Sequence, residues 1–244
     1  MLQARERPRQ EASDGGPRLR PLSAFSGSLS NRVFHSLKEA ILSIGYGPGE
    51  ILRKGEICAA LGVSRSPVAE AVARLAMEGL VDVVPQAGTY VARFSMAEIR
   101  EGAFLREAIE LAAVERVAAT VTDDQLAELR RNLEAQAAMF ERGDFKGFYR
   151  LDGEMHALIL SYTGYGRLAQ VSETAWLHVN RARQLILPVP GRIAATLDEH
   201  RAIVAALAAR DPARARAATR AHLGQLLTYL EPLERERPDL FDPS

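Results

Sequence analysis

The chain has 244 residues, of which 47% are hydrophobic and 25% charged, and its 31 basic residues balance 31 acidic ones. This composition excludes wholesale disorder, and the sequence holds no run of about 18 uncharged apolar residues that would cross a membrane. The single cysteine, Cys58, excludes an internal disulfide and is typical of a reducing compartment, so we expect a cytoplasmic protein.

The N-terminal 28 residues mix arginine, glutamate, proline, glycine and serine without apolar periodicity. We therefore expect a disordered arm over residues 1–28, and the missing apolar stretch argues against a secretory signal. Net charge is weakly asymmetric: residues 1–95 sum to +3 and residues 96–244 to −3. The sign favours the first part of the chain for any contact with phosphate groups.

Residues 29–93 are predicted to form a small module of three helices and a hairpin. Apolar residues at helical spacing predict helices from residue 30 to about 45, over 54–61, and from 66 to 79. Two β-rich runs, 80–84 and 89–91, flank a Pro/Gly turn and predict the hairpin. This order of elements is typical of a winged helix-turn-helix domain.

Residues 96–231 look helical throughout. Ser95 with Glu98 and Thr122 with Gln125 have the spacing of capping boxes, and Asp211-Pro212 marks another helix start. We expect six helices, over 96–120, 123–142, 144–162, 165–187, 191–209 and 212–231, and a tail over 232–244. The predicted fold class is mainly α: an N-terminal winged helix-turn-helix domain followed by an all-α six-helix bundle.

The N-terminus of the third helix of the module carries Ser64, Arg65 and Ser66. A helix start of this kind suits the major groove, where an arginine pairs with guanine and hydroxyls reach phosphates. The hairpin tip, with Gly88 and Thr89, is small and polar enough to lie along a DNA backbone. Spacing alone leaves a second interpretation open, in which the serines merely cap a core helix.

The run LGVSRSPVAEAVARLAMEGLVDVVPQAGTYV, with GPGEIL before it, resembles the DNA-binding domain of the GntR family of bacterial transcription regulators over residues 29–93. The resemblance implies operator DNA bound by a homodimer, with Ser64, Arg65 and Ser66 on the recognition helix and Gly88 at the wing tip.

The chain departs from the family pattern at positions that touch DNA. Arginine is common in the family where this chain has Gly55, Ala69 and Ala87, and an acidic residue where it has Lys54. Arg53 and Lys54 restore part of the phosphate attraction, so we expect DNA binding with an altered sequence preference.

Four residues of the predicted bundle suggest metal chemistry. Asp152 and His156 are four apart and share one helix face, and His200 and His222 lie among apolar residues of two later helices. Three imidazoles and a carboxylate that point into one bundle would bind a divalent transition metal. The sequence alone leaves the alternative open that each histidine is satisfied by a hydrogen bond of its own.

The patterns Arg106…Glu110, LDGEMH, EHRAIVAALAARD and AHL resemble the FCD ligand-binding domain of the FadR branch of the same family, over roughly residues 96–231. The resemblance implies a metal held by Asp152, His156, His200 and His222, for which we expect zinc, with nickel or manganese as alternatives. It also implies a small carboxylate effector.

Arg106 is the first candidate for binding the effector's carboxylate. Arg181 and Arg183 are further candidates, although two residues spaced two apart on a helix do not both face one pocket. His178 has no counterpart in the family's metal site.

These features predict a metabolite-responsive transcriptional repressor that is not an enzyme and has no membrane partner. A metal-dependent hydrolase is the main alternative, because open metal positions activate water. No general base stands out, since Glu154 lies on a different helix face from Asp152 and His156, and Glu199 directly precedes His200. A structural module stiffened by a metal is the other alternative.

Overall fold

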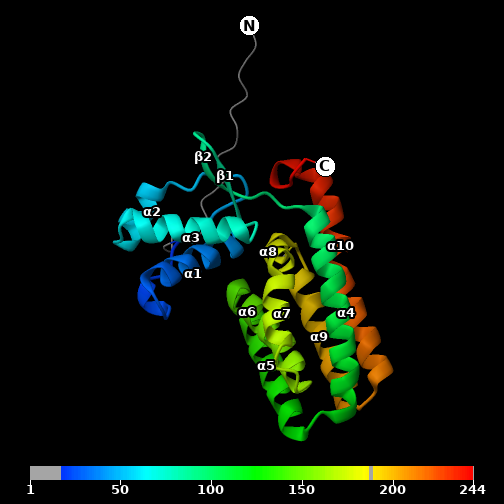
Figure 1. Cartoon of the computed structure of the whole chain (residues 1–244). Coiled ribbons are helices and arrows are strands. Elements are labelled where there is room, and N and C mark those ends of the chain that lie inside the picture. The colour runs from blue at the N-terminus through cyan, green and yellow to red at the C-terminus, as the bar shows by residue number, and fades with distance from the viewer. Residues whose placement is uncertain (1–17, 187–188, 244) are drawn as a thin grey trace. The chain divides into compact units, whose positions relative to one another are not determined.

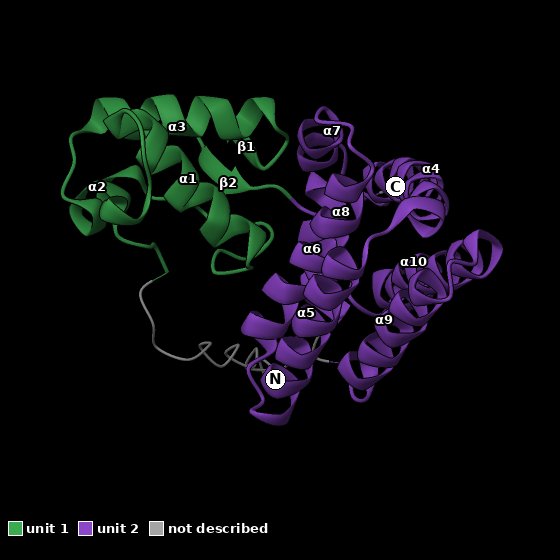
Figure 2. Cartoon of the chain, turned by 90° about the horizontal axis from the view of Figure 1, so that it is seen from below, with its two compact units in different colours: residues 1–92 green, residues 93–244 purple. Residues whose placement is uncertain are grey.

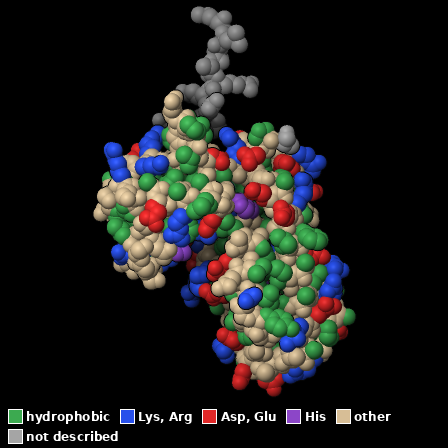
Figure 3. Space-filling view, viewed as in Figure 1, with side chains coloured by type: hydrophobic (Ala, Val, Ile, Leu, Met, Phe, Trp, Pro, Cys, Tyr) green, Lys and Arg blue, Asp and Glu red, His purple; other side chains and the backbone are tan. Residues whose placement is uncertain are grey.

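The computed structural model describes residues 18–186 and 189–243, and the chain divides into two compact units (Figures 1 and 2). Unit 1 is Met1–Ala92 and unit 2 is Arg93–Ser244. Among the described residues, no helix combines the length and the apolar character needed to cross a bilayer. Basic and acidic side chains are interspersed over the visible surface, as expected for a chain without net charge (Figure 3).

The described part of unit 1 contains three α-helices, a short 3-10 helix and a two-stranded antiparallel hairpin. Ser28 caps the first helix by accepting a hydrogen bond from the Asn31 backbone, and Gly62 ends the second in a left-handed conformation. Ile51 adds an isolated bridge to Tyr90 beside the hairpin. The elements are α1 (Leu29–Leu42), α2 (Lys54–Leu61), α3 (Arg65–Met77), β1 (Val81–Val84) and β2 (Gly88–Val91).

The core of unit 1 lies between the helices and the hairpin. Val33, Leu37, Val68 and Leu75 have no exposed surface there, and their spacing puts them on the inner faces of α1 and α3. The winged helix-turn-helix architecture expected from the sequence is therefore present.

Residues 18–28 contact α1 and do not form the disordered arm that the sequence predicts. Leu19 is only 8% exposed, and the Ser36 hydroxyl donates a hydrogen bond to the Arg20 carbonyl oxygen at 2.8 Å. A short 3-10 helix, Leu22–Ala24, precedes α1. The predicted disorder is thus wrong for residues 18–28, because buried Leu19 anchors the segment, and residues 1–17 lie outside the described residues.

Unit 2 is an all-helical bundle. Val117, Leu129, Ile203 and Leu207, from the three helices α4, α5 and α9, meet in its main core with no exposed surface. Thr122 and Gln125 form the expected capping box, whereas Ser95 caps its helix without a reciprocal bond from Glu98. The described helices are α4 (Met96–Thr120), α5 (Asp123–Glu141), α6 (Phe145–Tyr162), α7 (Leu168–Ala175), α8 (Leu177–Ile186), α9 (Arg192–Ala208) and α10 (Pro212–Glu236).

The expected helix over 165–187 is two helices, so unit 2 has seven described helices where the sequence predicted six. Neither glycine nor proline marks the break, which falls at Trp176. The indole is 6% exposed and lies beneath the Arg106 guanidinium, 5.3 Å from the ring centroid. The break therefore coincides with a tertiary contact that helix propensity does not reveal.

The predicted tail is also structured. Helix α10 continues through Pro232 to Glu236, and a 3-10 helix, Pro238–Leu240, follows. Phe241 is 3% exposed and pairs with Phe94 in a parallel bridge. The predicted boundary at residue 231 is wrong, because α10 continues to Glu236 and Phe241 beyond it is buried against Phe94.

Candidate functional site

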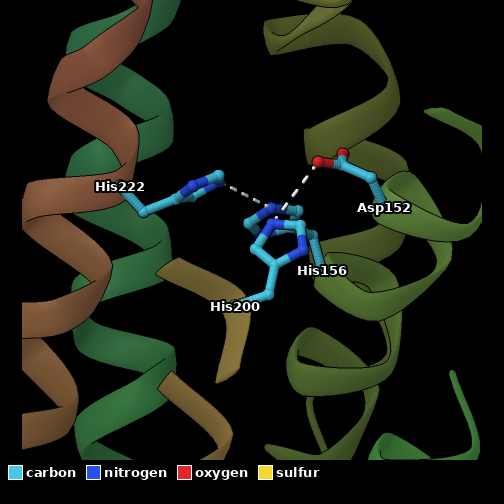
Figure 4. A group of neighbouring side chains, drawn as sticks. All are labelled: Asp152, His156, His200 and His222. Carbon is cyan, nitrogen blue, oxygen red and sulfur yellow. Dashed lines mark hydrogen bonds and ion pairs between the residues drawn. The ribbon is translucent and has the colours of Figure 1, made fainter. Parts of the chain in front are cut away.

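Four side chains from three helices meet inside unit 2 (Figure 4). Asp152 and His156 lie one turn apart on α6, His200 projects from α9 and His222 from α10. Each is at most 5% exposed, and one candidate ligand atom from each lies within 4.8 Å of all the others. The structure thus brings together the four residues that the sequence singled out.

Each of the three histidines has an acceptor at Nδ1 that fixes the orientation of its ring. Their Nδ1 atoms lie 2.6 Å from Glu110 Oε2, 2.8 Å from Gln136 Oε1 and 2.7 Å from Glu199 Oε2, for His156, His200 and His222 respectively. An Nδ1–H that donates to such an acceptor leaves the Nε2 lone pair for a metal. Indeed, Nε2 of His156 and Nε2 of His222 lie 3.2 Å apart, and Nε2 of His200 is 3.4 Å from Asp152 Oδ1.

Arginines form the next layer. Arg106 Nε donates to Glu110 Oε1 at 2.6 Å, and Arg192 binds Glu199 through both terminal nitrogens at 2.7 Å each. Arg183 forms an ion pair with Asp152. Each of these three carboxylates, of which Glu110 and Asp152 are buried and Glu199 is half-buried, therefore has an arginine partner that offsets the cost of burying its charge.

The electrostatic environment favours the protonation states that bind a metal, which are neutral imidazoles and an ionised carboxylate. Burial lowers the pKa of His200 and of His222 well below the usual range, and neighbouring histidines lower it further, so both imidazoles are neutral at pH 7. Burial alone would raise the pKa of Asp152, but the Arg183 guanidinium and the surrounding imidazoles outweigh it and lower that pKa. The pKa of Glu110 is lowered in the same way, against burial, by Arg106 and His156.

Two buried atoms of the cluster have no hydrogen-bond partner among the described residues. These are Asp152 Oδ1 and His200 Nε2, both pointing at the centre of the cluster. Buried polar atoms are normally satisfied, and a cation would bind both. Three imidazole nitrogens and one carboxylate oxygen are a donor set that divalent transition metals accept, so the residues fit a metal.

A small cavity adjoins the cluster. Its lining includes Asp152, His222, Arg106, Arg183 and Arg192, and its volume is about 30 Å³. That volume holds roughly two waters, at the ~10–15 Å³ that each one needs. An organic acid therefore requires side chains of the lining to move.

Arg181 does not join the pocket with Arg106 and Arg183. It is 1% exposed, and its guanidinium lies 4.4 Å from the centroid of the Phe94 ring. Residues two apart on a helix point in widely different directions. Because Arg183 faces the pocket, Arg181 faces away from it. The assignment of Arg181 to the effector is therefore wrong. His178 lies outside the cavity lining and faces Glu98 at 3.5 Å.

Sequence reasoning missed part of this layer. Gln136 carried no signal, because it meets His200 from a helix 64 residues earlier in the chain. The position of Glu199 directly before His200 suggests only a catalytic base, and no pattern in the sequence singles out Arg192. A carboxylate seven residues from an arginine on one helix, as in the Arg192–Glu199 pair, is the one local signal available.

The candidate DNA-contacting residues of unit 1 are mostly exposed. Arg53 and Lys54 stand at the start of α2, and Ser64, Arg65 and Ser66 at the start of α3. Ser64 occupies the capping position, but its side chain makes no capping hydrogen bond. Its hydroxyl is therefore available to a partner, which weakens the interpretation that the serines only cap a core helix.

The hairpin differs in one residue from the expectation. Gly88, with φ of +139°, pairs with Val84 next to the turn, but the following Thr89 is 4% exposed. Because successive strand side chains alternate between faces, Thr89 points into the unit. Its side chain cannot reach DNA while unit 1 is folded, so it is removed from the candidate contacts.

Two family models match the chain. Residues 29–91 match "Bacterial regulatory proteins, gntR family", and residues 101–225 match "FCD domain". The chain is 30% identical over 213 residues to the transcriptional repressor RspR of Escherichia coli K12, covering 87% of this chain and 93% of the relative. It is 34% identical over 209 residues to an uncharacterized HTH-type transcriptional regulator of Streptomyces ambofaciens, with coverages of 86% and 88%.

Solved structures agree on the fold. Escherichia coli McbR/YncC has a TM-score of 0.73 at 23% identity and covers 85% of this chain and 99% of its own. A putative transcriptional regulator GntR from Rhodococcus sp. RHA1 has a TM-score of 0.72 at 25% identity, with coverages of 83% and 99%.

Proposed function

The chain belongs to the gntR family of bacterial regulatory proteins and carries an FCD domain, and from this premise we propose a metal-dependent, ligand-responsive repressor. It is a transcriptional regulator, as its relatives are, and not an enzyme. The name of RspR and that of a probable D-xylose utilization operon repressor of Paenarthrobacter nicotinovorans, 30% identical over 182 residues, support repression as the direction of control.

The observation that carries the proposal is the orientation of all three histidines around one carboxylate. Asp152, His156, His200 and His222 would hold a divalent transition metal, zinc first, which when bound offers a Lewis-acid position to a carboxylate. Glu110, Gln136 and Glu199 fix the rings by accepting the Nδ1 protons. Such an arrangement makes the effector site part of the bundle core.

The pocket beside the cluster suits a small organic acid. Arg106 and Arg183 line it and supply positive charge, while Phe148, Ile186 and Leu226 supply apolar surface. Because both arginines already pair with carboxylates, the effector must compete with Glu110 and Asp152 for their N–H groups. We therefore expect modest affinity and selectivity for compact acids.

The DNA-binding half acts in the bacterial cytoplasm as a homodimer on a two-fold operator. The exposed Arg65 at the start of α3 would read a base, and Arg53 and Lys54 would bind phosphates. Effector binding would bias the spacing of two recognition helices, which requires different effector affinities in the two arrangements.

A structural metal is the second candidate, and the small cavity volume favours it. The two functions separate in one experiment. An operator selected from random duplexes is titrated with zinc-loaded protein, with and without a panel of small carboxylates. A regulator that senses an acid changes its operator affinity with at least one of them, whereas a structural metal leaves the affinity the same throughout the panel.

A further inference from the structure

Helix α8 makes two buried contacts in different directions. Arg183 reaches the pocket and pairs with Asp152. Arg181, two residues earlier, places its guanidinium over the Phe94 ring. Because a helix moves nearly as a rigid body, any shift of the α8 backbone that accompanies a change at Arg183 also moves Arg181.

Phe94 is the second residue after the boundary between the two units, which falls between Ala92 and Arg93. The segment of residues 238–242, here called the C-terminal strap, holds it there. The Phe94 amide donates to the Leu240 carbonyl at 3.0 Å, and the Asp242 amide donates to the Phe94 carbonyl at 2.9 Å. The rings of Phe94 and Phe241 are 5.7 Å apart at their centroids.

Arg93 lies between Ala92, which is hydrogen-bonded within unit 1, and Phe94, which is hydrogen-bonded within unit 2. On one side, the Ala92 amide donates to the Leu80 carbonyl within unit 1, at 3.0 Å. On the other, the strap binds Phe94 by two backbone hydrogen bonds, and the Arg93 Nε donates to the Asp239 carbonyl at 3.2 Å. Only Arg93 therefore separates Ala92, which is hydrogen-bonded within unit 1, from Phe94, which is hydrogen-bonded to the strap, and we call this point the hinge.

From these contacts we infer that α8 and the C-terminal strap couple the metal and effector pocket to the hinge of the DNA-binding unit. Arg183 responds to the state of Asp152, while Arg181 and Phe241 together hold Phe94. The inference rests on the proposed function and specifies how the same site is regulated. Arg181 and Phe241 are positioning residues that act on the hinge through Phe94.

Trypsin provides the test, because Arg93 is exposed and precedes Phe94 in the hinge. The rate of cleavage after Arg93 is followed by mass spectrometry in the full-length protein, free of metal or loaded with Zn²⁺. Each rate is divided by that for cleavage after Arg142, an exposed residue after α5, which corrects for general stabilisation by the bound ion.

Three variants accompany the wild type. Arg181→Met keeps the length of the buried side chain but loses its charge and planar face. Phe241→Ala removes the ring of the strap that packs on Phe94. Phe145→Ala removes an exposed ring elsewhere in unit 2 and serves as the matched control. Zinc content and far-ultraviolet circular dichroism are measured for each.

We expect zinc to slow the normalised cleavage of the wild type and of Phe145→Ala by about threefold or more. Arg181→Met should bind zinc equally well but lose this response. Phe241→Ala should be cleaved about tenfold faster with or without zinc, since the open hinge becomes more populated. Wild-type rates and a wild-type zinc response in both variants would overturn the inference.

Failure of the proposed function gives a different result. A wild type that binds no zinc refutes the metal site and with it the coupling through Arg183. The metal-free rates of Phe241→Ala and Phe145→Ala still decide whether the strap holds the hinge. Equal rates in those two variants refute that part as well.

Discussion

Glu199 Oε2 lies 2.7 Å from Nδ1 of His222, and the same carboxylate is held by both terminal nitrogens of Arg192. His156 has the equivalent arrangement with Glu110 and Arg106. Two of the three candidate imidazole ligands are thus oriented by a carboxylate that is itself fixed by an arginine. The predictions below follow from this arrangement and from the exposed face of unit 1.

Glu199→Ala should weaken metal binding by about 10–100-fold, the usual effect of losing an outer-shell partner of a metal-bound histidine. Without Glu199, the His222 ring loses its fixed orientation and its Nδ1 acceptor. The measurement is competition for Zn²⁺ against a chelator. Glu154→Ala is the matched control, because this exposed glutamate on α6 pairs with Arg150 outside the cluster. Similar losses of affinity in both variants would contradict the assigned role.

The stability of metal-free unit 2 should fall as the pH is lowered from 7.5 to 5.5. The lowered pKa values of His200 and His222 mean that the unfolded state binds more protons below about 6.5, so acid favours unfolding. Each histidine contributes a slope of at most about 1.4 kcal/mol per pH unit. The depressed pKa values of Asp152 and Glu110 act in the same direction at lower pH.

Urea unfolding followed by the fluorescence of Trp176, the only tryptophan, measures this effect in the presence of a chelator. A His200→Gln variant should show a shallower dependence of the free energy of unfolding on pH. His35→Gln, at an exposed position of unit 1, is the control and should match the wild type. A pH dependence that His200→Gln leaves unchanged would rule out this explanation.

Arg65→Ala should weaken operator binding by about 1–3 kcal/mol and relax discrimination at one base pair. Lys54→Ala should weaken binding to all duplexes alike. It should also make the slope of log affinity against log salt concentration shallower by about one. Titrations on operator and scrambled duplexes at several salt concentrations distinguish the two effects. If Arg65→Ala lowered affinity for both duplexes equally, Arg65 would contact only the backbone.

Thr89→Val should leave operator affinity within about twofold of wild type, because a buried side chain of nearly the same shape makes no contact with DNA. Gln86→Ala, in the turn of the hairpin, is the informative comparison, since Gln86 is exposed and has a φ of +60°. A large loss of affinity in Thr89→Val with the fold intact would return Thr89 to the DNA interface.

Local signals in the sequence predicted most helix boundaries. Thr122 with Gln125, Asp211 with Pro212, and Gly62 act within one turn of the backbone, so the residues themselves carry the information. The break at Trp176 and the ordering of Phe241 depend on tertiary partners, Arg106 and Phe94, which no local pattern announces.

The residues of the candidate site were likewise predictable only where local spacing or the family resemblance indicated them. Asp152 and His156 are one turn apart, so their shared face could be deduced, and the family resemblance pointed to His200 and His222. The acceptor for His200 could not be deduced, because Gln136 meets it only when α5 packs on α9. The side of α8 that carries Arg181 was also open, since spacing excluded a shared pocket but did not say which arginine faces it.

The metal content of protein purified without an affinity tag tests the central claim most directly. We predict about one divalent transition metal per wild-type chain and close to none in a His156→Ala/His200→Ala double variant. A His35→Ala/His178→Ala variant, which removes two histidines outside the cluster, should keep the wild-type content. Equal metal content in all three proteins, or none in the wild type, would contradict the account.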